Sequence, residues 1–321
     1  MIDKIKKYSR LIGIVIFVII LATIDWEKTL QIIKKADPLL ILFATILFPF
    51  FVLLKAVRWH ILLKGQGTEY SLKSCFLVYL SSNYLGVLTP GRIGELSKIF
   101  YLKQDTQLSY TRGFSNVLAD RLFDIVIMVV FACTGIFFFF RTYWLSTFLV
   151  IVLFILLIIV VIAYLRTLDT MIKRVLYRKN RHKIYSRLKI FFLSLVTFHT
   201  KTIMYSFGLT ILGFSIFFTI INLLAYSLRI QNGILFIPLS VSIASLVSMI
   251  PISVSGLGLR DLSLIVIFRQ VGFSPETAVS FSILFLFYFT GLWTLFGWIA
   301  WNIKPFSSSA RSIEEKMEEV Q

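Results

Sequence analysis

Long apolar runs separated by short polar segments make up most of this 321-residue chain. Two of the runs are interrupted, one at Pro90-Gly91 and the other around residues 251–258. Several of them approach or exceed the roughly 20 residues that a helix needs to cross a bilayer. The apolar blocks cover about 9–24, 38–58, 72–102, 112–139, 143–165, 201–226, 234–269 and 276–302. The pattern predicts an all-α polytopic membrane protein with about six full transmembrane helices and two broken helical hairpins.

Composition supports this prediction. The chain is 58% hydrophobic and only 15% charged, whereas soluble domains average about 25% charged residues. The net charge of +17 would also suit a nucleic-acid-binding protein. However, the basic residues gather at the ends of the apolar runs and in one linker, a distribution that orients a membrane protein and attracts anionic lipid. We therefore expect lipid partners and no nucleic-acid partner.

The placement of Lys and Arg also predicts the topology. The basic N-terminus and the linker 166–189, which has nine Lys and Arg residues against one Asp, should both be cytoplasmic. The chain must cross the membrane an even number of times between these two cytoplasmic segments. The segment 72–102 must therefore enter and leave the membrane on one side, as a re-entrant hairpin. Both termini are then expected to be cytoplasmic, in the plasma membrane of a bacterium or archaeon. The linker is either an amphipathic helix on anionic inner-leaflet lipid or a plain loop.

An internal similarity suggests two inverted repeats. The motif GRIGELS at 91–97 and the motif LGLRDLS at 257–263 share an acid-Leu-Ser triplet with an offset of 166. Inverted repeats with broken helices are a transporter architecture. The predicted units are an N-terminal membrane half (1–165), a basic linker (166–200), a second repeat (201–303) and a cytoplasmic tail (304–321).

The two breaks are candidate anion sites. Thr89 is placed to cap a helix that begins at Pro90, with Arg92 in its first turn, where free backbone N–H groups favour an anion. The second break offers hydroxyl groups, glycines and a base, namely Ser253, Ser255, Gly256, Gly258 and Arg260. The alternative is that the glycines serve only close packing of structural hairpins.

Charged residues also occur inside the apolar block 112–139. Asp120 and Asp124 share one helix face, and each unpaired charge at membrane depth costs at least about 2.5–3.5 kcal/mol. We expect Glu95 to pair with Arg121, and Arg92 with Asp120 or Asp124. The cluster is either a structural lock or a path for a headgroup or a proton, and these roles are compatible. The second half has Phe285 in place of such an acid, so the site should be asymmetric.

Three motifs carry a resemblance to a known family: NYLGVLTPGRIGELSK (83–98), ADRLFD (119–124) and PISVSGLGLRDLS (251–263). They resemble the signature regions of the lysylphosphatidylglycerol synthase transmembrane (flippase-like) family, over roughly residues 10–302. The resemblance implies a protein similar to the flippase part of the multiple peptide resistance factor, and a polyprenyl-phosphate sugar enzyme as a neighbour. The residues that match this pattern are Asn83, Pro90, Arg92, Gly94, Glu95, Arg121, Asp124, Gly256, Gly258 and Asp261. Small departures, such as an Asp where the family commonly has Glu, leave the substrate open.

We therefore predict a lipid translocase that moves an anionic, aminoacylated or glycosylated lipid between leaflets. The alternatives are an ion-coupled transporter of a small solute and a scaffold for a partner synthase or glycosyltransferase. Without an HExxH, CxxC or P-loop motif, we expect no enzymatic activity, cofactor or metal. The predicted headgroup-binding residues are Asn83, Arg92, Glu95, Asp120, Arg121, Asp124, Ser253, Ser255, Arg260 and Asp261. The predicted hairpin breaks are Pro90, Gly91, Gly94, Pro251, Gly256 and Gly258.

Overall fold

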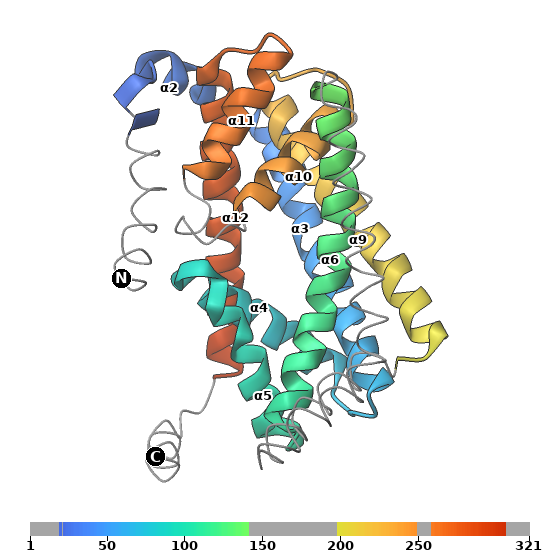
Figure 1. Ribbon diagram of the computed structural model, residues 1–321. Helices are drawn as coiled ribbons and strands as arrows, with labels where there is room; N and C mark the ends of the chain where they lie inside the picture. The colour runs from blue at the N-terminus through green and yellow to red at the C-terminus, as the bar shows by residue number, and fades with distance from the viewer. Residues whose placement is uncertain (1–18, 21, 141–197, 249–257, 306–321) are drawn as a thin grey trace, which may run out of the picture.

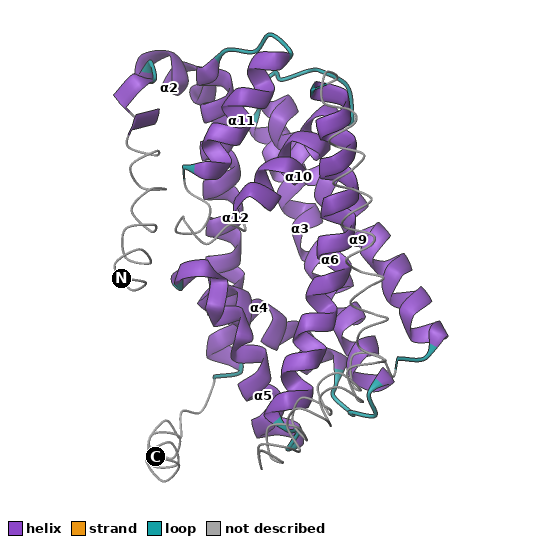
Figure 2. Ribbon diagram, viewed as in Figure 1, coloured by secondary structure: helices purple, strands orange, loops and turns teal. Residues whose placement is uncertain are grey.

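The computed structural model describes residues 19–140 except 21, then 198–248 and 258–305. All regular structure within these ranges is helical (Figure 2), which confirms the predicted all-α class. The predicted connecting helix 143–165, nearly all of the linker 166–200 and most of the predicted anchor 9–24 and tail 304–321 fall outside the described residues. The predicted domain limits therefore stay predictions.

Four helices in the described part are long and apolar enough to cross a membrane: α3 (Pro38–Gly65), α6 (Tyr110–Phe139), α9 (Thr200–Ser227) and α12 (Pro275–Ile303). They coincide with predicted blocks, and α3 continues beyond the predicted end at 58. Each has 28–30 residues and is about 42–45 Å long at 1.5 Å per residue. Asp37, Ser109 and Ser274 begin three of them, since each side chain accepts a hydrogen bond from a first-turn N–H.

Helix α3 contacts several other helices. It packs along α9 and also contacts α4 and α6. Phe48 of α3 meets Trp293 of α12 edge to face, with ring centroids 5.1 Å apart, in the arrangement that aromatic pairs prefer. Further along α3, Arg58 and Trp59 are fully buried. A base is thus carried into the interior on a largely apolar helix.

The first broken block forms three helices, α4 (Leu72–Leu88), the 3₁₀ helix η1 (Pro90–Leu96) and α5 (Ser97–Thr106). The Thr89 hydroxyl donates to the Leu85 carbonyl (2.9 Å) and accepts from the Gly94 N–H (2.7 Å). A Cβ at Gly94 would overlap the Leu85 carbonyl, so only glycine permits this approach. The break falls where it was predicted. A helix does begin at Pro90 after Thr89, as predicted, but it is a 3₁₀ helix, and the Thr89 hydroxyl accepts from the Gly94 N–H instead of from a first-turn N–H.

The second broken block contains α10 (Phe236–Ser248) and α11 (Leu259–Gln270), which pack against each other. Helix α10 also contacts α6, and α11 contacts α12. In Figure 1 this pair lies toward the upper end of the bundle, whereas α4 and α5 lie toward the lower end. Pro251, Ser253, Ser255 and Gly256 fall in 249–257, outside the described residues.

Polar contacts tie the helices together at both ends of the bundle. At the upper end, the unpredicted helix α2 (Trp26–Lys34) places Lys28 3.3 Å from Glu276 of α12. At the lower end, Lys304 Nζ lies 2.6 Å from Asp105 Oδ2, and the Tyr70 hydroxyl donates to the same oxygen at 2.6 Å. Burial, and then the hydrogen bond to Asp105, raises the pKa of Tyr70 far above its usual range. The phenol therefore stays a donor, and we call these three residues the lower latch.

Candidate functional site: a buried ion chain

Two bases of α3 meet two acids of α6 in the interior. Arg58 Nε donates to Asp120 Oδ1 (2.9 Å) and Nη1 donates to Asp124 Oδ1 (2.7 Å). Arg58 Nη2 also donates to the backbone carbonyl of Asp120 at 2.9 Å. Because the two acids are four residues apart on one helix face, a single planar guanidinium can bridge them. Such bidentate, charge-assisted contacts are the strong class of hydrogen bonds.

Lys55 extends this arrangement toward α9. Its Nζ lies 2.7 Å from Asp124 Oδ2 and about equally far from the Phe51 and Phe214 ring centroids, at 5.2 and 5.3 Å. Thr210 of α9 accepts a hydrogen bond from Arg58 Nη1 at 3.0 Å. Cation–π contacts of this kind gain strength where water is excluded. The acids of α6 are thus joined to both α3 and α9.

Lys98 of α5 lies at the opposite end of this row of charges from Lys55. Its Nζ lies 3.6 Å from Asp120 Oδ2, 3.4 Å from the Tyr79 ring centroid and 5.2 Å from that of Trp59. Its side chain is 0% exposed. The five charges alternate in sign along the row Lys98–Asp120–Arg58–Asp124–Lys55, which we call the ion chain.

A second ion pair lies beside the ion chain. Arg121 of α6 pairs with Glu95 of η1, as the sequence predicts. The Glu95 side chain is buried, whereas that of Arg121 is 31% exposed. A Cβ at Gly86 would overlap the Glu95 side chain, so the small residue on α4 makes room for this acid. The pair fastens η1 to α6.

The start of α11 holds a separate charged cluster. The Gly258 N–H donates to Asp261 Oδ2 at 2.9 Å, and Arg260 Nη2 donates to Asp261 Oδ1 at 3.1 Å. Ser282 of α12 accepts from Arg260 Nε at 3.2 Å and also bonds Asp261. The guanidinium carbon lies 5.4 Å from the centroid of Phe285. These contacts occupy Arg260 with its own neighbours.

Comparison with known proteins identifies the family. A model of the lysylphosphatidylglycerol synthase transmembrane region matches residues 10–297. The chain belongs to this family.

Relatives of this family member occur in several archaea. A UPF0104 membrane protein of Pyrococcus horikoshii is 34% identical over 130 residues, 39% of each chain. A UPF0104 membrane protein of Methanocaldococcus jannaschii is 22% identical over 319 residues, 92% of this chain and 95% of that protein. The glycosyltransferase AglD of Haloferax volcanii is 24% identical over 145 residues, 40% of this chain and 23% of AglD.

The structure of this family member brings some of the predicted site residues together and separates others. Asp120, Asp124, Glu95 and Arg121 meet at one place, whereas Arg260 and Asp261 form the α11 cluster. Asn83 faces its own helix, with its amide donating to the Tyr79 carbonyl at 2.8 Å. The side chain of Arg92 and residues Pro251, Ser253, Ser255 and Gly256 are outside what the structure describes. Arg92 was expected beside Asp120 or Asp124, but the described partners of both acids come from α3 and α5.

Sequence reasoning missed three members of the ion chain. Lys98 is the last residue of the motif 83–98 but was not predicted as a site residue, and Lys55 and Arg58 were not singled out. The available signal was the stretch LLKAVRWHILL (53–63), in which two bases three residues apart interrupt an apolar run. Bases near the end of an apolar run usually lie at the membrane surface. In the structure, α3 continues through them.

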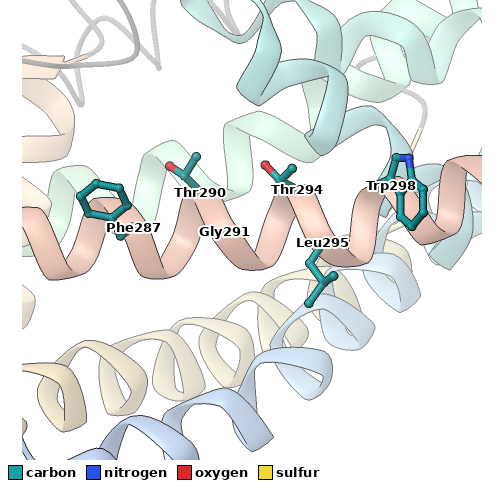
Figure 3. Close-up of a pocket in the computed structure, with 6 residues that line it drawn as sticks. All are labelled: Phe287, Thr290, Gly291, Thr294, Leu295 and Trp298. Atoms are coloured by element: carbon teal, nitrogen blue, oxygen red, sulfur yellow. The ribbon is translucent and has the colours of Figure 1, made fainter.

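An open groove of about 410 Å³ runs along α12 (Figure 3). Thr290 and Thr294 project from one side of the helix and Leu295 from the other. The lining residues are Phe287, Thr290, Gly291, Thr294, Leu295 and Trp298. None of them is charged or belongs to the ion chain.

Proposed function

We propose that this protein is a lipid translocase that moves an anionic, aminoacylated or glycosylated lipid between the two leaflets of the plasma membrane. One observation carries the proposal. Around the ion chain, four cations (Lys55, Arg58, Lys98 and Arg121) face three carboxylates (Glu95, Asp120 and Asp124). The described cluster therefore has a formal charge of +4 − 3 = +1. A buried surplus charge is unfavourable unless it is paired, and a phosphate headgroup would pair it.

The depth of the cluster supports this function. Arg58 lies seven residues before the end of α3, and Asp120 lies ten residues after the start of α6. These positions are about 10 and 15 Å along their helices, roughly a quarter and a third of the helix lengths. A headgroup that reaches these residues has therefore entered between the helices, below their ends, which a translocase requires and a surface-binding protein does not.

The two short-helix units fit the same function. We interpret α4 with η1 and α5, and α10 with α11, as re-entrant hairpins of two inverted repeats that enter from opposite sides of the membrane. Both termini and the basic linker would then face the cytoplasm. Irregular backbone at membrane depth is tolerated where it lines a cavity or is buried in protein. Two hairpins from opposite sides could expose one headgroup path alternately to each leaflet.

A second candidate function is a membrane partner for a lipid-modifying enzyme. The similarity to AglD, which is named as a glycosyltransferase, favours it. In that case the purified chain would move no lipid on its own but would bind a lipid-modifying synthase or glycosyltransferase. An ion-coupled transporter of a small solute uses the same charged residues but needs an aqueous substrate. Neither alternative accounts for the surplus charge as directly as an anionic lipid does.

The test is a scrambling assay with purified protein in liposomes. We expect fluorescent phosphatidylglycerol to become accessible to an external quencher faster than in protein-free liposomes, and faster than fluorescent phosphatidylcholine. Asp124→Asn should abolish this difference, whereas Glu27→Gln, at an exposed acid of α2, should not change it. Equal rates with and without protein would refute translocation by the chain alone.

A further inference from the structure

The ion chain contains one positive charge more than neutrality requires. Taken alone, its three cations and two carboxylates sum to +3 − 2 = +1, and the adjacent Glu95–Arg121 pair is neutral. Arg58, Asp120 and Lys98 are at most 1% exposed, so bulk water does not compensate the surplus. Two events could restore neutrality: an anion enters, or one cation loses a proton.

The three cations are not equal candidates for losing a proton. Arg58 stays charged, because a guanidinium is not deprotonated in proteins. Lys55 Nζ donates a 2.7 Å hydrogen bond to Asp124, and its side chain is 12% exposed. Lys98 Nζ has no hydrogen-bond acceptor among the described residues, and its carboxylate partner is 3.6 Å away. The Lys98 ammonium is therefore the least well solvated of the three.

The groups around Lys98 favour the same assignment. Helix α6 contributes Asp120 and, farther off, Asp124, and α3 contributes Arg58. Helix α4 contributes two neutral acids, Tyr79 against the ammonium and the nearby thiol of Cys75. Loss of a proton from either of these would create a new buried charge, whereas loss from the ammonium removes one. Desolvation therefore favours deprotonation of the ammonium.

We propose that anion binding at this site is linked to protonation of Lys98. The empty site holds Lys98 as a neutral amine, and the occupied site holds it as an ammonium ion, so that one proton is taken up for each anionic headgroup bound. Only an N–H bond forms in this step, and its proton comes from the solvent. The inference rests on the proposed function and gives it a coupling ion, since a proton gradient could then drive lipid movement. Binding should tighten by up to about tenfold per unit fall in pH.

Titration calorimetry tests the linkage. Purified protein in phosphatidylcholine nanodiscs is titrated with short-chain phosphatidylglycerol in buffers of different ionisation enthalpy, which gives the number of protons taken up. We expect about one proton per lipid bound for the wild type. Lys98→Arg, whose charge is fixed, should bind lipid without proton uptake, and Lys98→Met should bind more weakly, also without uptake. Lys103→Met, on the same helix and in no ion pair of the described residues, should behave as the wild type.

The outcomes separate the inference from the proposed function. Wild-type binding without proton uptake, or uptake that persists in Lys98→Arg or Lys98→Met, overturns the linkage but leaves lipid binding intact. Absence of any lipid binding by the wild type overturns both. Lys98→Arg has a fixed positive charge and Lys98→Met has none, so neither side chain can take up the proton. If one variant misfolds, the other still tests the linkage.

Discussion

Replacement of Arg58 by lysine tests whether the ion chain holds the bundle together. Arg58→Lys keeps the positive charge but replaces a planar fork by a point charge. The guanidinium makes hydrogen bonds to both carboxylates, to the Asp120 carbonyl and to Thr210, at 2.7 to 3.0 Å. An ammonium at the end of a flexible stem cannot meet all of these partners at once.

The expected loss follows from the hydrogen bonds that cannot be made. We expect two of the four to be lost, and a hydrogen bond to a charged group contributes about 1.5–3 kcal/mol. Arg58→Lys should therefore lower the free energy of unfolding by about 3–6 kcal/mol. Because a folded domain is typically stable by only about 5–15 kcal/mol, the variant should be close to unfolding.

Equilibrium unfolding in mixed micelles measures this change. The fluorescence of Trp59, which lies beside Lys98, reports on the same region. The control is Arg269→Lys at an exposed position of α11, which should change the free energy of unfolding by less than about 0.5 kcal/mol. If the free energy of unfolding of Arg58→Lys lies within about 1 kcal/mol of the wild-type value, the guanidinium bridge contributes little and the reasoning is refuted.

Three further predictions concern the break at Gly94, the lower latch and the topology of the linker. Gly94→Ala should prevent closure of η1 on α4 and lower the yield and the thermal stability of the folded protein. Gly291→Ala, at a position with open space around it, should leave both unchanged, and equal thermal stability of the two variants would contradict the prediction. Tyr70→Phe removes one hydrogen bond of the lower latch and should lower the free energy of unfolding by about 1.5–3 kcal/mol in the same micelle assay, while Tyr205→Phe, at an exposed tyrosine of α9, should have no effect. In a Cys75→Ser/Cys133→Ser background, single cysteines at 178–183 should resist an impermeant thiol reagent applied to intact cells, and labelling from outside would overturn the predicted topology.

The sequence predicted the elements of the fold better than the contacts between them. Long apolar runs identify α3, α6, α9 and α12 because a membrane span must satisfy its own backbone and present apolar side chains. Pro90 and its neighbouring glycines identify the break for a similarly local reason. The 3₁₀ form of η1 was not predictable in this way. It depends on the approach of Gly94 to Leu85, which is a tertiary contact.

The site was predictable only in part, for the same reason. Asp120 and Asp124 stand out because carboxylates in an apolar run must have partners. Their main partner, Arg58, is 62 and 66 residues away in the sequence, and no local pattern specifies that pairing. Glu95 and Arg121 were matched correctly because both came from motifs already singled out. Lys55 and Arg58 were overlooked because bases near the end of an apolar run usually lie at the membrane surface.

The two short-helix units differ in charge balance, and this difference indicates where an ionic ligand could bind. At the start of α11, Arg260 and Asp261 neutralise each other, and Ser282 and the Phe285 ring of α12 complete their surroundings. In the proposed repeat, the region of α12 around Phe285 corresponds to residues 120–124 of α6 and contains no acid. The described residues at the start of α11 therefore hold a balanced pair, whereas the first unit contacts a charged row with one cation in surplus. The anionic headgroup of the proposed substrate would gain Coulomb energy at this surplus cation and not at the balanced Arg260–Asp261 pair.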